Sequence, residues 1–170
     1  MKDIIICDLD GTLCGIEHRL HHVQKADNNG LKRKPDWDAF FDGILDDVIN
    51  EPVLRVLQEM SLGNCGCSYG SNHRELIFCS GRPERCRADT VEWLHRADED
   101  LFDPDPELEN YKLYMRKDGD YRSDVIVKQE ILDAHIDEDR VLFVLDDRQS
   151  VVDMWRRNGL TCFQVAAGDF

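Results

Sequence analysis

A pair of carboxylates stands near the start of the chain, where Asp8 and Asp10 follow the apolar run 4–7. Such a run predicts a buried strand of a parallel sheet, and ligands bind at the carboxyl ends of such strands. Alternation along the strand points both side chains to one side, and Gly11 permits a sharp turn after them. Two carboxylates this close repel each other unless a cation lies between them or one takes up a proton. The alternative is an acidic strand end facing solvent, which the specific order Asp-x-Asp-Gly-Thr disfavours.

Two later apolar runs also end in polar groups, which are Ser80, Gly81 and Arg82 after residues 76–79, and Asp146 and Asp147 after residues 141–145. Pro83 predicts a helix start, which would bring backbone N–H groups and a helix dipole beside the serine hydroxyl as an anion site. Four carboxylates at one sheet edge need a counter-cation, and carboxylate, carbonyl and water ligands suit Mg²⁺. The pattern therefore predicts a magnesium-dependent site for a phosphate.

These groups need a scaffold that brings them together. Helical periodicity over residues 51–60, 83–96, 124–135 and 150–158 alternates with strand-like runs at 4–7, 76–79, 111–115, 141–145 and 161–165. This alternation predicts an α/β fold with a mainly parallel sheet. Asp36 is a plausible N-cap of a further short helix whose aromatic stripe is either core or the anchor of a cap over the site. Lys128 lies early in the helix 124–135, where an exposed lysine is the default expectation.

The composition limits the possible partners. A length of 170 residues suits one domain, and the net charge of −14 argues against a broad electrostatic grip on nucleic acid. It leaves room for capture of one strand end by a few placed Arg or Lys residues. The basic island Lys32-Arg33-Lys34 is either a solvated loop or such a phosphate contact.

The cysteines favour a reducing compartment. There are seven, an odd number, and Cys7, Cys79 and Cys162 lie in apolar runs. With no signal segment and no apolar run near the ~20 residues of a membrane span, we expect a cytoplasmic protein without a membrane partner. Cys65 and Cys67 with His73 hint at zinc, but their spacing fits no standard structural site and a fourth ligand is not evident.

Four motifs in this order, Asp8-Leu9-Asp10-Gly11-Thr12, Ser80, Lys128 and Asp146-Asp147, resemble those of the haloacid dehalogenase (HAD) superfamily of phosphotransferases. The resemblance implies a three-layer Rossmann-like core in a single domain over residues 1–170. It also implies a small cap inserted after the first strand, at about residues 15–50. The second aspartate of the first motif points to the phosphatase branch.

Residues 119–128 and 145–170 resemble more closely the phosphatase domain of phage-type polynucleotide kinase/3′-phosphatase. That resemblance implies an enzyme in which Asp8 attacks phosphorus, Asp10 acts as the general acid and base, and Lys128 is a third catalytic residue. It implies contacts to the substrate phosphate from Thr12, Arg19, Ser80, Gly81, Arg82 and Asp124. It also implies that Mg²⁺ is held by Asp8, the Asp10 carbonyl, Asp146 and, through water, Asp147.

The substrate is the open question. The 170 residues contain no G-x-x-x-x-G-K-[ST] phosphate loop, so we do not expect kinase activity from them, and residues 20–50 do not match the kinase-linked enzyme. The favoured hypothesis is a 3′-phosphatase for nucleic-acid ends, acting in repair. The first alternative is a phosphatase of free nucleotides or other small phosphomonoesters, and the second is a non-enzymatic binding module. DNA or RNA as substrate, and a homo-oligomer, are left open.

Overall fold

The computed structural model describes residues 2–24, 34–61, 74–99, 101–102 and 111–168. Its centre is a five-stranded sheet in the order β5-β4-β1-β6-β7, in which every pair of neighbours is parallel. The strands are β1 (Ile4–Cys7), β4 (Glu75–Pro83), β5 (Tyr111–Arg116), β6 (Val141–Arg148) and β7 (Cys162–Gly168). The mainly parallel sheet predicted from the sequence is confirmed.

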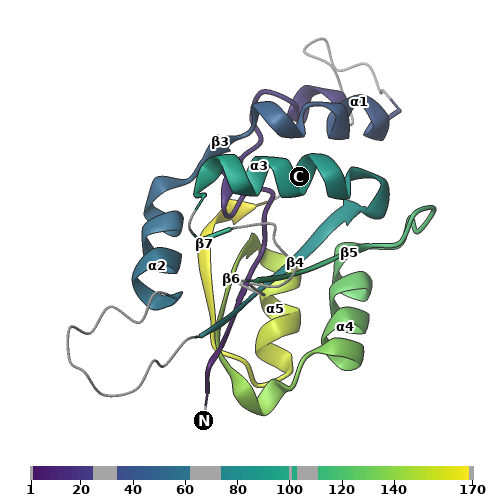
Figure 1. The fold of residues 1–170 in the computed structure, drawn as a ribbon. Helices are drawn as coiled ribbons and strands as arrows, with labels where there is room; N and C mark the ends of the chain where they lie inside the picture. Colours follow the sequence, from purple (N-terminus) through teal and green to yellow (C-terminus); the bar gives the residue numbers. More distant parts are fainter. Residues whose placement is uncertain (1, 25–33, 62–73, 100, 103–110, 169–170) are drawn as a thin grey trace.

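Helices cover both faces of this sheet (Figure 1). They are α2 (Glu51–Ser61), α3 (Arg87–Ala97), α4 (Asp124–His135) and α5 (Gln149–Arg157). Successive side chains of β1 point to opposite faces, so Ile5 and Cys7 pack with residues of α2 and α3, while Ile4 and Ile6 pack with residues of α4 and α5. The result is the predicted three-layer α/β core, with one hydrophobic cluster on each side of the sheet.

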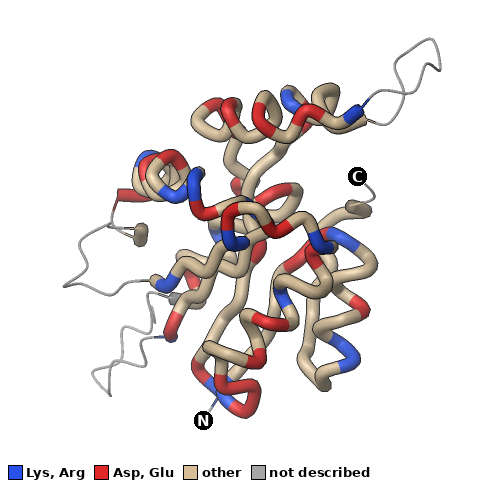
Figure 2. The backbone as a smooth tube through the Cα atoms, turned by 90° about the vertical axis from the view of Figure 1, so that its right-hand side faces the viewer, with Lys and Arg blue, Asp and Glu red and all other residues tan. Residues whose placement is uncertain are grey.

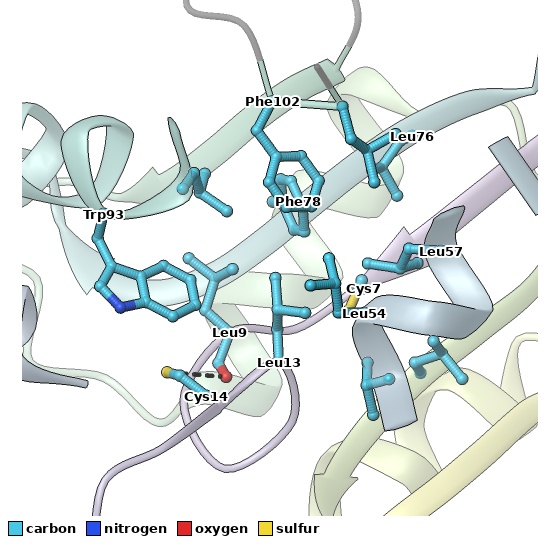
Figure 3. Packing of buried hydrophobic residues seen from close by; sticks show 14 of the residues in the cluster. Cys7, Leu9, Leu13, Cys14, Leu54, Leu57, Leu76, Phe78, Trp93 and Phe102 are labelled. Carbon is cyan, nitrogen blue, oxygen red and sulfur yellow. Dashed lines mark hydrogen bonds between the residues drawn. The ribbon is translucent and has the colours of Figure 1, made fainter. Parts of the chain in front are cut away.

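The loop after β1 is anchored in the core by two leucines. Figure 3 shows Leu9 and Leu13 pointing into the cluster beside Trp93, and both leucines are 0% exposed. The Cys14 thiol donates to the Leu9 carbonyl at 3.3 Å. Because the core holds the apolar residues of this loop, its carboxylates face the end of the sheet.

A small cap follows the first strand. Within the described part of residues 14–49, β2 (Cys14–Gly15) pairs antiparallel with β3 (Val48–Ile49), and between them lie η1 (Leu20–His22), α1 (Trp37–Asp42) and η2 (Ile44–Asp46). Asp36 caps α1 as predicted, since its side chain accepts from the Ala39 N–H at 3.0 Å. Figure 1 shows α1 above α3, at the end of the sheet toward which β1 runs. The expectation of one domain over residues 1–170 stays a prediction.

The start of the third helix was predicted wrongly. β4 runs through Pro83, which pairs with Arg116 after a register shift, and η3 (Glu84–Cys86) precedes α3. The expected helix start at Pro83 therefore does not occur, and α3 begins only at Arg87. Another short helix, η4 (Glu138–Arg140), precedes β6. The zinc hint at Cys65, Cys67 and His73, and residues 32 and 33 of the basic island, lie outside the described residues.

Candidate active site

Three neighbouring parallel strands, β4, β1 and β6, end at the same edge of the sheet. Predicted site residues stand at these ends, with Asp8 and Asp10 after β1, Ser80, Gly81 and Arg82 in β4, and Asp146 and Asp147 in β6. The Asp8 N–H donates to the Leu145 carbonyl at 3.0 Å, which ties the end of β1 to β6. Sheet topology therefore brings together groups that are up to 139 positions apart in the printed numbering.

Asp8, Asp146 and Asp147 form an acidic triad, in which one carboxylate oxygen of each lies within 4.8 Å of the other two. All three residues are buried. Burial raises the pKa of Asp8 well above its usual range, and the charges of Asp146 and Asp147 also raise it. Burial and the Asp146 charge raise the pKa of Asp147 to about 6. A divalent cation would relieve this concentration of negative charge, and a set of carboxylate donors suits a hard cation such as Mg²⁺.

Lys128 reaches the triad from α4. Its Nζ lies 2.7 Å from Asp8 Oδ1 and 2.8 Å from Asp146 Oδ2. Burial lowers the pKa of Lys128, but the charges of Asp146 and Asp8 outweigh burial and hold that pKa well above its usual value. The indole N–H of Trp155 donates to the same Asp146 oxygen at 3.1 Å. The default expectation of an exposed lysine is wrong, because Lys128 is 2% exposed.

Asp147 is enclosed by two glycines. A Cβ at Gly11, where φ is +84°, or at Gly168 would collide with the Asp147 carboxylate. The Thr12 hydroxyl donates to Asp147 Oδ1 at 3.2 Å, and the Gln164 amide donates to the Asp147 carbonyl at 2.9 Å. The structure thus places Thr12 at the triad, and its contact with the substrate phosphate stays a prediction. Gly168 was not among the predicted site residues.

Asp10 belongs to a second cluster, which we call the Arg–Asp ring and which consists of Asp10, Arg19, Asp47 and Arg82. The Nη2 atoms of Arg19 and Arg82 lie 2.6 Å and 2.5 Å from Asp10 Oδ1. Asp47 closes the ring, with Oδ1 2.6 Å from Arg19 Nε and Oδ2 2.7 Å from Arg82 Nη2. Both arginines are almost fully buried. Two positive and two negative charges cancel, which limits the cost of burying them.

The ring controls the protonation of Asp10. Burial raises the pKa of this carboxyl, but the charges of Arg82 and Arg19 outweigh burial and hold the pKa well below its usual range. Asp10, Cys14 and Asp47 are also residue types that bind metals and lie close together, yet the two guanidinium groups already neutralise the two carboxylates. Sequence reasoning missed Asp47, because only the ring identifies it.

Asp124 lies in the first turn of α4 between two further arginines that were also not predicted. Arg116 pairs with Asp124 Oδ1, and Arg148 Nη1 lies 2.5 Å from Asp124 Oδ2. Arg116 Nε also donates to the Gly81 carbonyl at 2.8 Å, and a Cβ at Gly81 would lie 2.8 Å from Asp124 Oδ1. The Arg148 N–H donates to Asp146 Oδ1 at 3.2 Å. This cluster ties β4, β5, β6 and α4 together, and the predicted contact of Asp124 with a phosphate stays a prediction.

Ser80 and Gly81 are held in place beside the ring. Ser80 is 0% exposed, and its Oγ accepts from the Arg82 N–H at 3.2 Å. Because α3 begins at Arg87, the N–H groups of its first turn do not follow Ser80 directly as the sequence suggested. Positive charge at this point of the site comes from the side chains of Arg19 and Arg82 rather than from a helix end.

Comparison with known proteins places this geometry in context. A family model described as the phosphatase domain of polynucleotide kinase PNKP matches residues 2–170. A protein of Autographa californica nuclear polyhedrosis virus, named as a bifunctional polynucleotide kinase/RNA ligase, is 28% identical over 153 residues. That match covers 89% of this chain and 17% of the viral protein, so the chain spans a minor part of the relative's length.

Solved structures agree with this match. A chain from the structure of the Pnkp1/Rnl/Hen1 RNA repair complex is 34% identical with a TM-score of 0.69, covering 98% of this chain and 43% of that one. A chain from a second Pnkp1/Rnl/Hen1 structure is 32% identical with a TM-score of 0.69, covering 100% of this chain and 48% of that one. A haloacid dehalogenase-like hydrolase from Streptococcus pneumoniae is 15% identical with a TM-score of 0.55, covering 95% of this chain and 83% of that one, and shares the fold.

Among the described residues, none of the helices is long and apolar enough to cross a membrane.

Proposed function

Because the chain belongs to the family of polynucleotide kinase PNKP phosphatase domains, we propose that it removes 3′-phosphates from the ends of nucleic-acid strands. It is a phosphatase of the HAD type, so a purely binding role on this fold is set aside. One observation carries the proposal. The acidic triad with Lys128, and the Arg–Asp ring, both stand where three parallel strands end.

Asp8 is the proposed nucleophile. Lys128 at 2.7 Å favours its ionised form, which burial alone would disfavour. One Asp8 oxygen forms a bond to phosphorus as the bond to the 3′-oxygen breaks, which leaves an aspartyl phosphate. Water then attacks this phosphorus, inorganic phosphate leaves, and the Asp8 carboxylate is restored. Mg²⁺, when held by Asp8, Asp146 and Asp147 with the Asp10 carbonyl, would supply positive charge toward the phosphate oxygens.

Asp10 is the proposed general acid for the leaving 3′-oxygen, and it later accepts a proton from the attacking water. In the Arg–Asp ring its pKa is held low, which does not suit an acid. We infer that the incoming phosphate pairs with Arg19 and Arg82, so that their ion pairs with Asp10 break. Asp10 then loses the charges that lower its pKa and can hold the proton that the leaving oxygen needs. Asp47 keeps both guanidinium groups in position during this exchange.

Ser80, Gly81 and Asp124 take supporting parts in this proposal. The buried Ser80 hydroxyl can donate its proton to a phosphate oxygen. Its oxygen can still accept the hydrogen bond from the Arg82 N–H. Asp124 is a carboxylate and repels phosphate, so its effect on the substrate acts through Arg116, which also holds the Gly81 carbonyl. Lys128 and the two ring arginines would offset the negative charge of the non-bridging oxygens in the transition state.

RNA ends are the substrates that we propose to test first. One similar chain comes from a complex described as an RNA repair complex, and the viral relative is named as a polynucleotide kinase/RNA ligase. We therefore place this phosphatase in nucleic-acid repair, alongside other end-processing activities. The described cysteines are free and buried, which supports a reducing, cytoplasmic setting.

A phosphatase of small phosphomonoesters is the second candidate, and the charge of the chain favours it. The net charge is −14, and Figure 2 shows acidic residues spread over the cap, the helices and the loops. A long nucleic-acid strand would meet repulsion over much of this surface. Only contacts close to the terminal phosphate would then hold a polynucleotide.

One comparison separates the two candidates. Initial rates are measured with Mg²⁺ on a 3′-phosphorylated oligoribonucleotide, its DNA counterpart, a 3′-mononucleotide and a 5′-mononucleotide, with Asp8→Asn as the blank. We expect the highest kcat/KM on an oligonucleotide 3′-phosphate. A preference for the 5′-mononucleotide, or equal rates on all four, would support the small-substrate candidate instead.

A further inference from the structure

The cap carries an exposed aromatic side chain that the proposed chemistry does not use. Of the three tryptophans in the chain, Trp93 and Trp155 are buried in the core, whereas Trp37 at the start of α1 is 47% exposed. Its exposed indole offers solvent a flat aromatic face, which can pack against a planar ligand.

Trp37 lies close to Arg19, one of the two arginines of the Arg–Asp ring. The Arg19 guanidinium carbon is 4.2 Å from the centre of the Phe40 ring, and the Trp37 and Phe40 ring centres are 5.7 Å apart, so Trp37 lies within about 10 Å of that guanidinium. Phe40, which contacts both groups, is 2% exposed. The exposed indole is therefore near enough to Arg19 for one nucleotide to contact both side chains.

Neighbouring contacts hold Trp37 in this position. Its ring stacks on Phe41 at 6.1 Å with an angle of 26° between the planes. The Arg85 guanidinium lies 5.8 Å from the centre of the Phe41 ring and pairs with Asp38 at 2.5 Å. Arg85 belongs to η3 of the core, so this pair joins α1 to the core. The indole is therefore positioned before any substrate arrives, which reduces the entropy lost on binding.

We propose that Trp37 stacks on the base of the nucleotide whose 3′-phosphate enters the Arg–Asp ring. This inference rests on the proposed function and names the part of the substrate that the cap recognises. Base stacking on an aromatic ring does not depend on charge, so it suits a chain whose net charge of −14 disfavours contacts along the phosphate backbone. It also tolerates all four bases, as an end-processing enzyme requires.

The kinetic test uses Trp37→Leu, which keeps an apolar side chain without a π face, and Trp37→Phe, which keeps a ring. The substrates are a 3′-phosphorylated oligonucleotide, the same strand with an abasic 3′-terminal residue, and p-nitrophenyl phosphate. We expect Trp37→Leu to lower kcat/KM on the base-bearing strand by about 5- to 150-fold, mainly through KM. Rates on the abasic strand and on p-nitrophenyl phosphate should not change, and Trp37→Phe should retain most of the activity.

Tyr121→Ala serves as the matched control, because Tyr121 is 91% exposed and lies on the loop before α4 rather than on the cap. The effect of Trp37→Leu counts only where it exceeds that of this control. A loss of equal size on all three substrates would show that Trp37 only stabilises the cap, and no loss on the base-bearing strand would also overturn the proposal.

Fluorescence gives a readout that does not depend on turnover. Because Trp93 and Trp155 are buried, acrylamide should quench mainly Trp37. In the Asp8→Asn background, saturation with the 3′-phosphorylated oligonucleotide should protect this emission, whereas the abasic strand should not. Unchanged quenching despite demonstrated binding would contradict stacking. If wild-type protein hydrolyses p-nitrophenyl phosphate but no 3′-phosphorylated strand, the proposed function itself has failed.

Discussion

Asp8 and Asp10 leave the same strand two residues apart, but different cations hold them. Asp8 lies 2.7 Å from Lys128, whereas Asp10 lies 2.5 Å from Arg82 and 2.6 Å from Arg19. Burial raises the pKa of Asp8, while the two guanidinium groups lower that of Asp10 despite its burial. Neighbouring carboxyls whose pKa values are moved apart are a common basis for separate roles in catalysis.

The first prediction concerns the nucleophile. Asp8→Asn should lower kcat by about 10⁴-fold or more on every substrate, since losses of this order follow removal of a nucleophile. Removing one charge from the acidic triad relieves repulsion, so the melting temperature without metal should not fall. A variant that turns over at a near wild-type rate with Mg²⁺ would exclude Asp8 as the attacking group.

The second prediction separates leaving groups. Asp10→Asn should slow hydrolysis of a 3′-phosphorylated nucleotide by about 10²–10⁴-fold, because its alkoxide leaving group needs a proton. The loss on p-nitrophenyl phosphate should be much smaller, because nitrophenolate leaves without one. Initial rates of the same preparation on both substrates give the ratio. Equal losses on the two substrates would mean that Asp10 only pairs with the arginines of the Arg–Asp ring and does not transfer a proton.

The third prediction addresses the Arg–Asp ring. Asp47→Asn leaves two buried guanidinium groups with one carboxylate, so the free energy of unfolding should fall by about 3–5 kcal/mol. Asp38→Asn is the control, because Asp38 pairs with Arg85 in an exposed position. The Asp38→Asn substitution should lower the free energy of unfolding by about 1 kcal/mol or less. Urea unfolding at pH 7 measures both, and similar values for the two variants would contradict the buried ring.

The fourth prediction concerns pH and metal. The folded pKa of Asp147 is raised from 3.8 to about 6, so between these values the folded protein binds a proton that the unfolded chain does not. Without metal, stability should therefore fall as pH rises through this window, and the raised pKa of Asp8 acts in the same direction. Mg²⁺ competes with these protons, so its stabilising effect should grow as pH rises. Melting curves with Mg²⁺ and with chelator at pH 5 and pH 7.5 test this, and Asp147→Asn should flatten both trends.

The fifth prediction concerns the glycine next to the triad. Gly168→Ala places a methyl group against the Asp147 carboxylate and should lower Mg²⁺ affinity by about 10- to 100-fold, the usual effect of disturbing a ligand's supporting shell. Ala167→Ser adds one atom at the exposed neighbouring position and should leave affinity unchanged. Titration of Mg²⁺ against melting temperature compares the two variants, and identical titration curves would show that Asp147 is not confined by Gly168.

The sequence predicted the carboxylates of the site better than it predicted the residues that pack around them. Apolar runs that end in carboxylates located Asp8, Asp10, Asp146 and Asp147. Each run is a local signal for a buried strand, and the carboxyl ends of parallel strands meet at one edge of the sheet. Lys128 was identified by resemblance, since helix periodicity alone favoured an exposed side chain there. Only the folded chain shows its burial at 2% exposure.

Contacts between distant segments could not be predicted. Asp47 is 28 residues from Arg19 and 35 from Arg82, and its neighbour Asp46 has the same side chain, so no local pattern separates them. The helix start was misplaced because Pro83 satisfies a helix rule locally, while pairing with Arg116 keeps it in the strand. The role of Gly168 could not be predicted, because only the folded structure shows that it lies against the Asp147 carboxylate.

The zero net charge of the Arg–Asp ring has a consequence for phosphate selection. A group that displaces Asp10 must bring enough negative charge to replace a carboxylate at two guanidinium groups. A terminal phosphomonoester carries close to two charges at neutral pH, whereas an internal phosphodiester carries one. If the ring binds the substrate phosphate as proposed, we expect it to favour the terminal phosphomonoester of a strand over an internal phosphodiester, whatever the base.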